Sequence, residues 1–145
     1  MNELKDILIE MTEFFQKFLP LEKEKLKAAE NKQVTFVEEC MTKEQAMILK
    51  LRGYEKQRED ILKKAGLEGK TLAEIIEMLF GEEKVQMKAV TEAFSRSVRE
   101  FQSANEEALK LIQLNLRELD AVLAEKEQDG LPNGNIPGHL TDQIV

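Results

Sequence analysis

The stretch from Glu82 to about Gln128 contains no proline or glycine and reads as one amphipathic helix. Its apolar residues recur three or four positions apart, the spacing that places side chains on one helical face. They are Val90, Phe94, Val98, Phe101, Leu109, Ile112, Leu116, Leu119 and Leu123. At a rise of about 1.5 Å per residue this helix would be roughly 70 Å long, more than a compact domain can cover. Part of its apolar stripe therefore needs a partner.

The composition also favours long helices over a rounded domain. Of the 145 residues, 34% are charged and 6% aromatic, and tryptophan is absent. This profile is typical of coiled coils and elongated helical bundles. The net charge of −7 is spread over interleaved acidic and basic residues. Because nucleic acids attract concentrated basic patches, we expect no nucleic-acid partner. The densest basic group, Lys23, Lys25 and Lys27, alternates with glutamates and is expected to be a solvated face.

A first helix is predicted over residues 2–30 and a second over residues 33–65. Pro20 lies inside the first and is expected to kink or break it, since proline removes one backbone hydrogen bond and crowds the preceding turn. The apolar pattern weakens after it, so residues 22–30 are expected to pack less well. Asn31 is predicted to end the helix in the left-handed conformation. Cys40 lies at the edge of the second helix's apolar face and is expected to be a small buried residue.

The clearest helix signals stand in the middle of the chain. Gly66 followed by Leu67 has the form of a C-terminal cap. Thr71 with Glu74 forms a capping box that predicts a short helix over residues 71–80, closed by Gly81. The long helix then spans residues 82–128, and we expect its first half, from Val85 to Phe101, to be core.

The last residues, 129–145, differ in composition from the rest. They contain three of the seven glycines and two of the three prolines, which favours a flexible tail. We therefore predict an all-α fold: an elongated antiparallel helical bundle or coiled coil with three long helices, one short helix and a flexible C-terminal tail. Residues 1–128 form the predicted helical domain.

The sequence offers no convergent set of residues for catalysis or metal binding. His139 is the only histidine and Cys40 the only cysteine, and they lie far apart in sequence. We predict a protein that is not an enzyme and that needs no cofactor. There is no signal peptide and no apolar run of membrane-spanning length, so no membrane insertion is expected and a cytoplasmic location is the default.

Three motifs carry a resemblance to a known family. The first is Glu55-x-x-Arg58-x-x-Ile61-Leu62-x-x-x-Gly66-Leu67, the second is Thr71-Leu72-Ala73-Glu74-Ile75-Ile76, and the third is Asn105-x-x-Ala108-Leu109-x-x-Ile112. With the order of helices over about residues 3–125, the chain resembles the FlgN-like flagellar export chaperones. The resemblance departs from the family at Ala108, where a leucine is usual, and at Glu44 or Gln45, near the place of a family lysine.

The resemblance implies a cytoplasmic chaperone that binds hook-associated (hook-filament junction) proteins and delivers them to the export gate of the flagellar type III apparatus. Family members bind these proteins largely through their C-terminal part. The candidate binding residues on the final helix are Ala108, Ile112, Leu116, Leu119, Val122 and Leu123. Leu131, Ile136, Leu140 and Ile144 in the tail form a candidate second contact.

Two other functions fit the same apolar stripe. The chain could be a structural coiled-coil homo-oligomer whose long helix pairs with copies of itself, or a helical adaptor for an unrelated protein. Both remain open from the residues alone.

Overall fold

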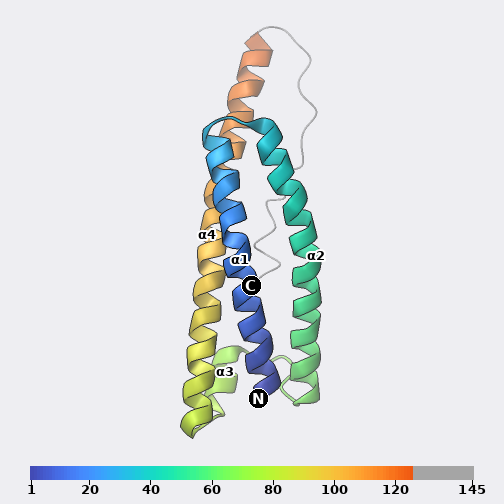
Figure 1. The fold of residues 1–145 in the computed structure, drawn as a ribbon, viewed down its shortest axis with the longest axis vertical. Helices are drawn as coiled ribbons and strands as arrows, with labels where there is room; N and C mark the ends of the chain where they lie inside the picture. Colours follow the sequence, from blue (N-terminus) through green and yellow to red (C-terminus); the bar gives the residue numbers. More distant parts are fainter. Residues whose placement is uncertain (126–145) are drawn as a thin grey trace.

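The computed structural model describes residues 1–125, and over this range the chain is all-α, without strands (Figure 1). Its helices are α1 (Asn2–Glu30), α2 (Val34–Lys64), α3 (Leu72–Glu77) and α4 (Gly81–Glu125). The predicted fold class, with three long helices and one short helix, is confirmed. The predicted tail over residues 129–145 lies outside the described residues.

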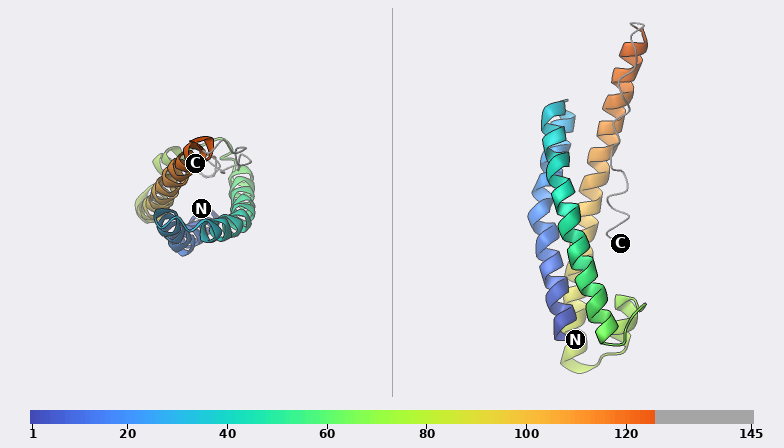
Figure 2. Two further views of the ribbon diagram at one scale, coloured as in Figure 1. Left: turned by 90° about the horizontal axis from the view of Figure 1, so that it is seen from above. Right: turned by 90° about the vertical axis from the view of Figure 1, so that its right-hand side faces the viewer.

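Helix α1 is the central element of the bundle. It packs against α4 along one side and against α2 along the other, and α3 packs on α4. Within residues 1–125, the backbones of α2 and α4 do not come close to each other. Seen from above, α1 lies between them (Figure 2). The bundle is therefore open between α2 and α4, and α4 extends beyond the turn that joins α1 to α2.

The main core lies in the lower two thirds of the bundle and is built around aromatic residues. The rings of Phe15 and Phe101 lie 5.4 Å apart between centroids, and those of Phe14 and Tyr54 lie 5.5 Å apart, which joins α1 to α4 and to α2. Met87, Phe94 and Val98 complete the α4 side, as expected, whereas Val85 is 62% exposed. The core of α4 thus begins at Met87.

Helix α1 runs without a break through Pro20, so the expected break is absent. Pro20 lies on the exposed side of the helix, where its missing N–H costs little, and packing on two sides holds the helix together. The expectation of weak packing after Pro20 is also wrong. Glu22, Lys25, Ala28 and Ala29 are all buried, because small alanines and paired charges replace large apolar residues there.

The α1–α2 turn uses a different residue from the one predicted. Asn31 has φ −90°, and the left-handed residue is Lys32, with φ 55°. The N–H of Gln33 donates to the Ala28 carbonyl at 2.9 Å, and the N–H of Lys32 donates to that of Ala29 at 3.1 Å. This pair of hydrogen bonds is typical of a helix C-terminus that is closed by one left-handed residue. Glycine is the usual residue at that position.

Lys32→Gly is expected to raise the free energy of unfolding by about 0.5–1 kcal/mol, because glycine adopts positive φ without the steric cost that a Cβ brings. The change also removes a contact of Lys32 with Glu118, but both side chains are more than half exposed and such pairs contribute little. Urea unfolding measures the difference. Asn31→Gly is the matched control and should give no gain, so equal stabilisation by both variants would contradict the assignment.

The caps predicted in the middle of the chain are present. Gly66 has φ 72°, and the N–H of Leu67 donates to the Leu62 carbonyl at 2.8 Å. The Thr71 hydroxyl accepts a hydrogen bond from the Glu74 N–H at 3.2 Å. Helix α3 ends at Glu77 instead of residue 80, because tighter turn bonds replace the helical pattern at Met78 and Leu79.

Candidate protein-binding site

The apolar stripe of α4 changes from covered to exposed along its length. Ala108 and Ile112 are buried, with Ile112 packed in a small cluster with Ala28, Ala29 and Val37. Beyond them, Leu116, Leu119 and Val122 are 37%, 41% and 45% exposed, and Leu123 is half-buried. The change occurs where α1 ends and α2 begins, because no described helix continues beside α4 beyond the turn that joins them (Figure 2).

An apolar groove lies between this part of α4 and the first turns of α2. Its volume is about 250 Å³, and we call it the α2–α4 groove. The α4 wall is formed by Ile112, Asn115, Leu116 and Leu119, and the opposite wall and floor by Ala29, Lys32, Val34, Val37, Glu38 and Met41. The upper part of α4 therefore faces a second apolar surface and does not stand alone.

A part-buried hydrogen bond joins the groove walls, and an exposed ion pair lies at the rim. The Asn115 side-chain amide donates to the Ala29 carbonyl at 2.8 Å, near the end of α1. The Lys32 ammonium lies 3.4 Å from a carboxylate oxygen of Glu118 at the rim. Because the Asn115 hydrogen bond ties α4 to the end of α1, the groove walls are held in place before any ligand binds, which lowers the entropy cost of binding.

The predicted site residues fall into three groups. Leu116 and Leu119 line the groove, and Val122 extends its apolar surface along α4. Ala108 is buried in the bundle, and Ile112 forms the base of the groove. These two residues hold the groove in shape but offer little exposed surface to a partner. The tail positions Leu131, Ile136, Leu140 and Ile144 lie outside the described residues.

Sequence reasoning missed the α2 side of the groove. Val34, Val37 and Met41 follow a regular apolar spacing and read as part of the buried face of a bundle helix. Val34 is in fact 65% exposed, because the groove separates it from α4. Periodicity identifies which side chains share a face, but it does not say whether another helix covers that face.

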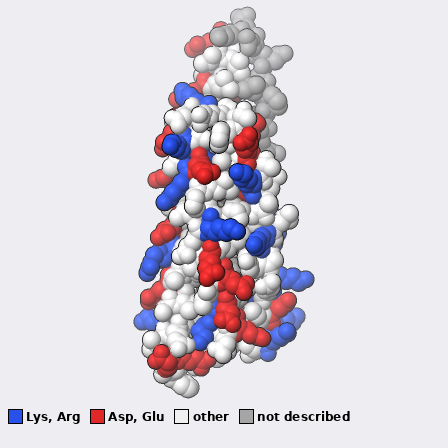
Figure 3. All heavy atoms as spheres, in the orientation of Figure 1, with Lys and Arg blue, Asp and Glu red and all other residues white. Residues whose placement is uncertain are grey.

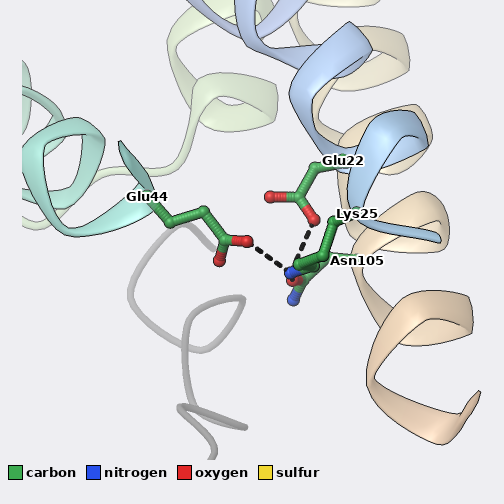
Figure 4. A network of polar contacts seen from close by, with 4 residues as sticks. All are labelled: Glu22, Lys25, Glu44 and Asn105. Atoms are coloured by element: carbon green, nitrogen blue, oxygen red, sulfur yellow. Dashed lines mark hydrogen bonds and ion pairs between the residues drawn. The ribbon is translucent and has the colours of Figure 1, made fainter. Parts of the chain in front are cut away.

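A cluster of buried charges joins the three long helices below the groove (Figure 4). The Lys25 ammonium lies 2.9 Å from a carboxylate oxygen of Glu22 and 2.6 Å from one of Glu44, and it donates to the Asn105 side-chain oxygen at 3.0 Å. All four side chains are at most 2% exposed. The expectation that Lys25 lies on a solvated face is therefore wrong. We call these residues the buried ion cluster.

The cluster holds two carboxylates and one ammonium, so its charges do not balance when both acids are ionised. Burial, together with the charge of Glu44, raises the pKa of Glu22 from 4.5 to about 7, although Lys25 opposes the shift. Burial also raises the pKa of Glu44, again against Lys25. Both Glu22 carboxylate oxygens, Glu44 Oε1 and the Asn105 side-chain nitrogen lack hydrogen-bond partners, and only Glu22 Oε2 and Glu44 Oε1 are ion-paired with Lys25. The cluster therefore lowers stability near neutral pH while it joins α1, α2 and α4.

The described residues show no arrangement for metal chemistry or for a reactive thiol. Across residues 1–125, no three or more histidine, cysteine or acidic side chains come together as a metal site. Cys40 is buried, as predicted, and burial raises the pKa of its thiol, which disfavours the reactive thiolate. Over the same range, no helix has the length and apolar character needed to cross a bilayer.

Basic and acidic side chains are mixed over the face of the molecule that Figure 3 shows, without a broad basic area. A helical bundle with an apolar groove and mixed surface charge defines a class of helical protein-binding modules. The comparison with protein families gives the particular one: the FlgN protein family matches residues 1–128, and the chain belongs to this family. No curated protein and no solved structure matches the chain.

Membership gives the chain a role as a flagellar chaperone in export and flagellum assembly, in a family of chaperones and not of enzymes. Binding of flagellar hook-associated proteins is the general activity that the family implies.

Proposed function

We propose that this chain binds a helical segment of hook-associated proteins in the α2–α4 groove and delivers them to the flagellar export gate in the cytoplasm. One observation carries the proposal: the apolar stripe of α4 continues past its covering helices as exposed Leu116, Leu119 and Val122, opposite exposed Val34. Burying such a surface is favourable by roughly 25 cal/mol per Å². An amphipathic helix laid beside α4 would bury it.

The groove suits a helix because both of its walls are helical. A helix that enters it would pack between α4 and the first turns of α2, beyond the end of α1, and would extend the bundle by one partner element. Its apolar face would then be hidden from self-association before export. Without nucleotide chemistry, release follows from competition for the cargo at the export gate, where a different surface binds the freed helix.

The groove is tested by the double substitution Leu116→Asp with Leu119→Asp. We expect affinity for purified hook-associated proteins to fall by about 100-fold or more, since two side chains at the centre of an apolar contact become charged. Both residues are at least 37% exposed, so the fold should survive. Calorimetry measures affinity and circular dichroism measures helicity.

Leu49→Asp is the matched control for that test. Leu49 is 69% exposed on α2 and does not line the groove, so this variant should bind normally. Unchanged affinity in the double variant would exclude the groove as the cargo site. Leu123 is half-buried, and a change there would mix binding with stability.

Self-association is the second candidate, because the same exposed leucines could pair α4 with α4 of another copy. Light scattering over a concentration series distinguishes the two. A monomer at all concentrations argues against a structural oligomer, whereas a dimer that Leu116→Asp with Leu119→Asp dissociates would show that copies of the chain share the groove.

A further inference from the structure

A second exposed apolar surface lies at the opposite end of the molecule, where α3 meets α4 (Figure 1). Met78, Phe80 and Val85 are 51%, 84% and 62% exposed there. We call these three residues the α3–α4 turn patch. An aromatic ring left almost fully in water is costly, and grouped exposed apolar residues mark interaction sites more often than single ones do.

The patch rests on a well-packed base. Ile75 is 1% exposed, and Leu79 is packed against the main core. The N–H of Met78 donates to the Ile75 carbonyl at 3.1 Å, and Gly81 takes φ 64° to begin α4. Ile75 and Leu79 therefore fill the inside of the turn, while Met78 and Phe80 lie outside it. Because the backbone of the turn is already ordered, binding of a partner would cost little conformational entropy.

The charge near Phe80 is mainly acidic, with Lys84 and Lys88 on either side of Val85. Between Lys70 and Lys84 the chain carries four acidic residues and no basic ones. These are Glu74, Glu77, Glu82 and Glu83, and all are exposed. Acidic atoms lie at the lower tip of the molecule in Figure 3, with basic atoms not far above them. A surface complementary to this one would place lysine or arginine around an apolar pocket.

We propose that the α3–α4 turn patch docks a second protein partner whose surface has basic side chains around an apolar pocket, and that Phe80 fills this pocket. The patch is distinct from the α2–α4 groove. From Val85 to Leu116, α4 advances by about 45 Å at 1.5 Å per residue, so partners at the two ends do not compete for the same surface. The inference goes beyond the proposed function and does not depend on which cargo the groove holds.

Site-specific cross-linking in the native cell tests this inference. The full-length chain carries a photoreactive phenylalanine analogue at position 80, and a second version carries it at position 49, an exposed apolar control on α2. We expect position 80 to give a discrete adduct with a protein that has a basic surface. Glu82→Lys with Glu83→Lys should lower the yield at least fivefold, and Leu116→Asp with Leu119→Asp should leave it unchanged.

Other outcomes overturn the inference. These are a yield at position 80 no higher than at position 49, an adduct insensitive to charge reversal, an adduct with a second copy, and an adduct that the groove variant abolishes. If the charge-reversal variant Glu82→Lys with Glu83→Lys does not fold, Glu82→Gln with Glu83→Gln takes its place.

The purified partner, titrated against the full chain, should bind at least tenfold more weakly to Phe80→Ser and normally to Leu49→Ser. Cargo calorimetry at the groove tests the proposed function separately.

Discussion

Lys25→Met is expected to lower the free energy of unfolding by about 3–5 kcal/mol at pH 8, the cost of leaving buried charge without its partner. The ammonium of Lys25 is the counter-ion of both Glu22 and Glu44, and all three side chains are buried. Methionine fills a similar volume without charge, so two carboxylates would face each other in a low-dielectric interior. At pH 5 the loss should be smaller, because these carboxyl groups can then bind protons.

Urea unfolding of the wild type and the variant at both pH values checks this result. Lys23→Met is the matched control: Lys23 is exposed two residues away on the same helix, and its loss should change stability by less than about 0.5 kcal/mol. A Lys25→Met variant as stable as the control would mean that the cluster does not persist in solution. Replacing Glu22, Lys25 and Glu44 together with apolar residues should recover most of the stability.

Glu22→Gln should stabilise the protein at pH 8 by roughly 3–4 kcal/mol at most, because each unit of pKa shift corresponds to about 1.4 kcal/mol. The pKa of Glu22 is raised to about 7 from 4.5. Between pH 4.5 and 7 the folded protein keeps a proton that the unfolded chain releases, so stability falls as pH rises through this window and levels off above it. Glutamine stays neutral and leaves a balanced Lys25–Glu44 pair.

The measurement is the difference in unfolding free energy between variant and wild type as a function of pH. It should be near zero at pH 4.5 and should grow to its full value above pH 7. Glu24→Gln, at an exposed neighbouring position, should show no such change. A constant difference across the range would show that Glu22 does not titrate with a raised pKa.

Local signals predicted the elements of the fold well. Periodic apolar spacing gave α1 and α2 to within one residue at each end, and helix caps are present at Gly66 and Thr71, where they were predicted. The errors arose where neighbouring helices outweigh a local rule. Pro20 does not break α1 because α2 and α4 hold that helix on two sides, and Lys32 is left-handed because the turn geometry requires it.

The groove was only half visible in the sequence. Leu116, Leu119 and Val122 were predicted as binding residues because their stripe is longer than the bundle can cover, and they are exposed. Val34 and Met41 were not predicted as binding residues, because the apolar spacing along a helix is the same for a buried face and for an exposed binding face. The α3–α4 turn patch was not predicted, because Phe80 was placed inside a short helix over residues 71–80 that in fact ends at Glu77.

The sequence by itself determined that this chain forms long amphipathic helices and that α4 is too long for its own bundle, because spacing along one helix fixes which side chains share a face. Tertiary structure alone decided which faces are covered. It opened the groove between α2 and α4, since these helices pack on α1 and their backbones do not come close to each other. It also buried Lys25 between Glu22 and Glu44, because a charge pattern typical of a solvated surface becomes an interior one when helices from three parts of the chain enclose it.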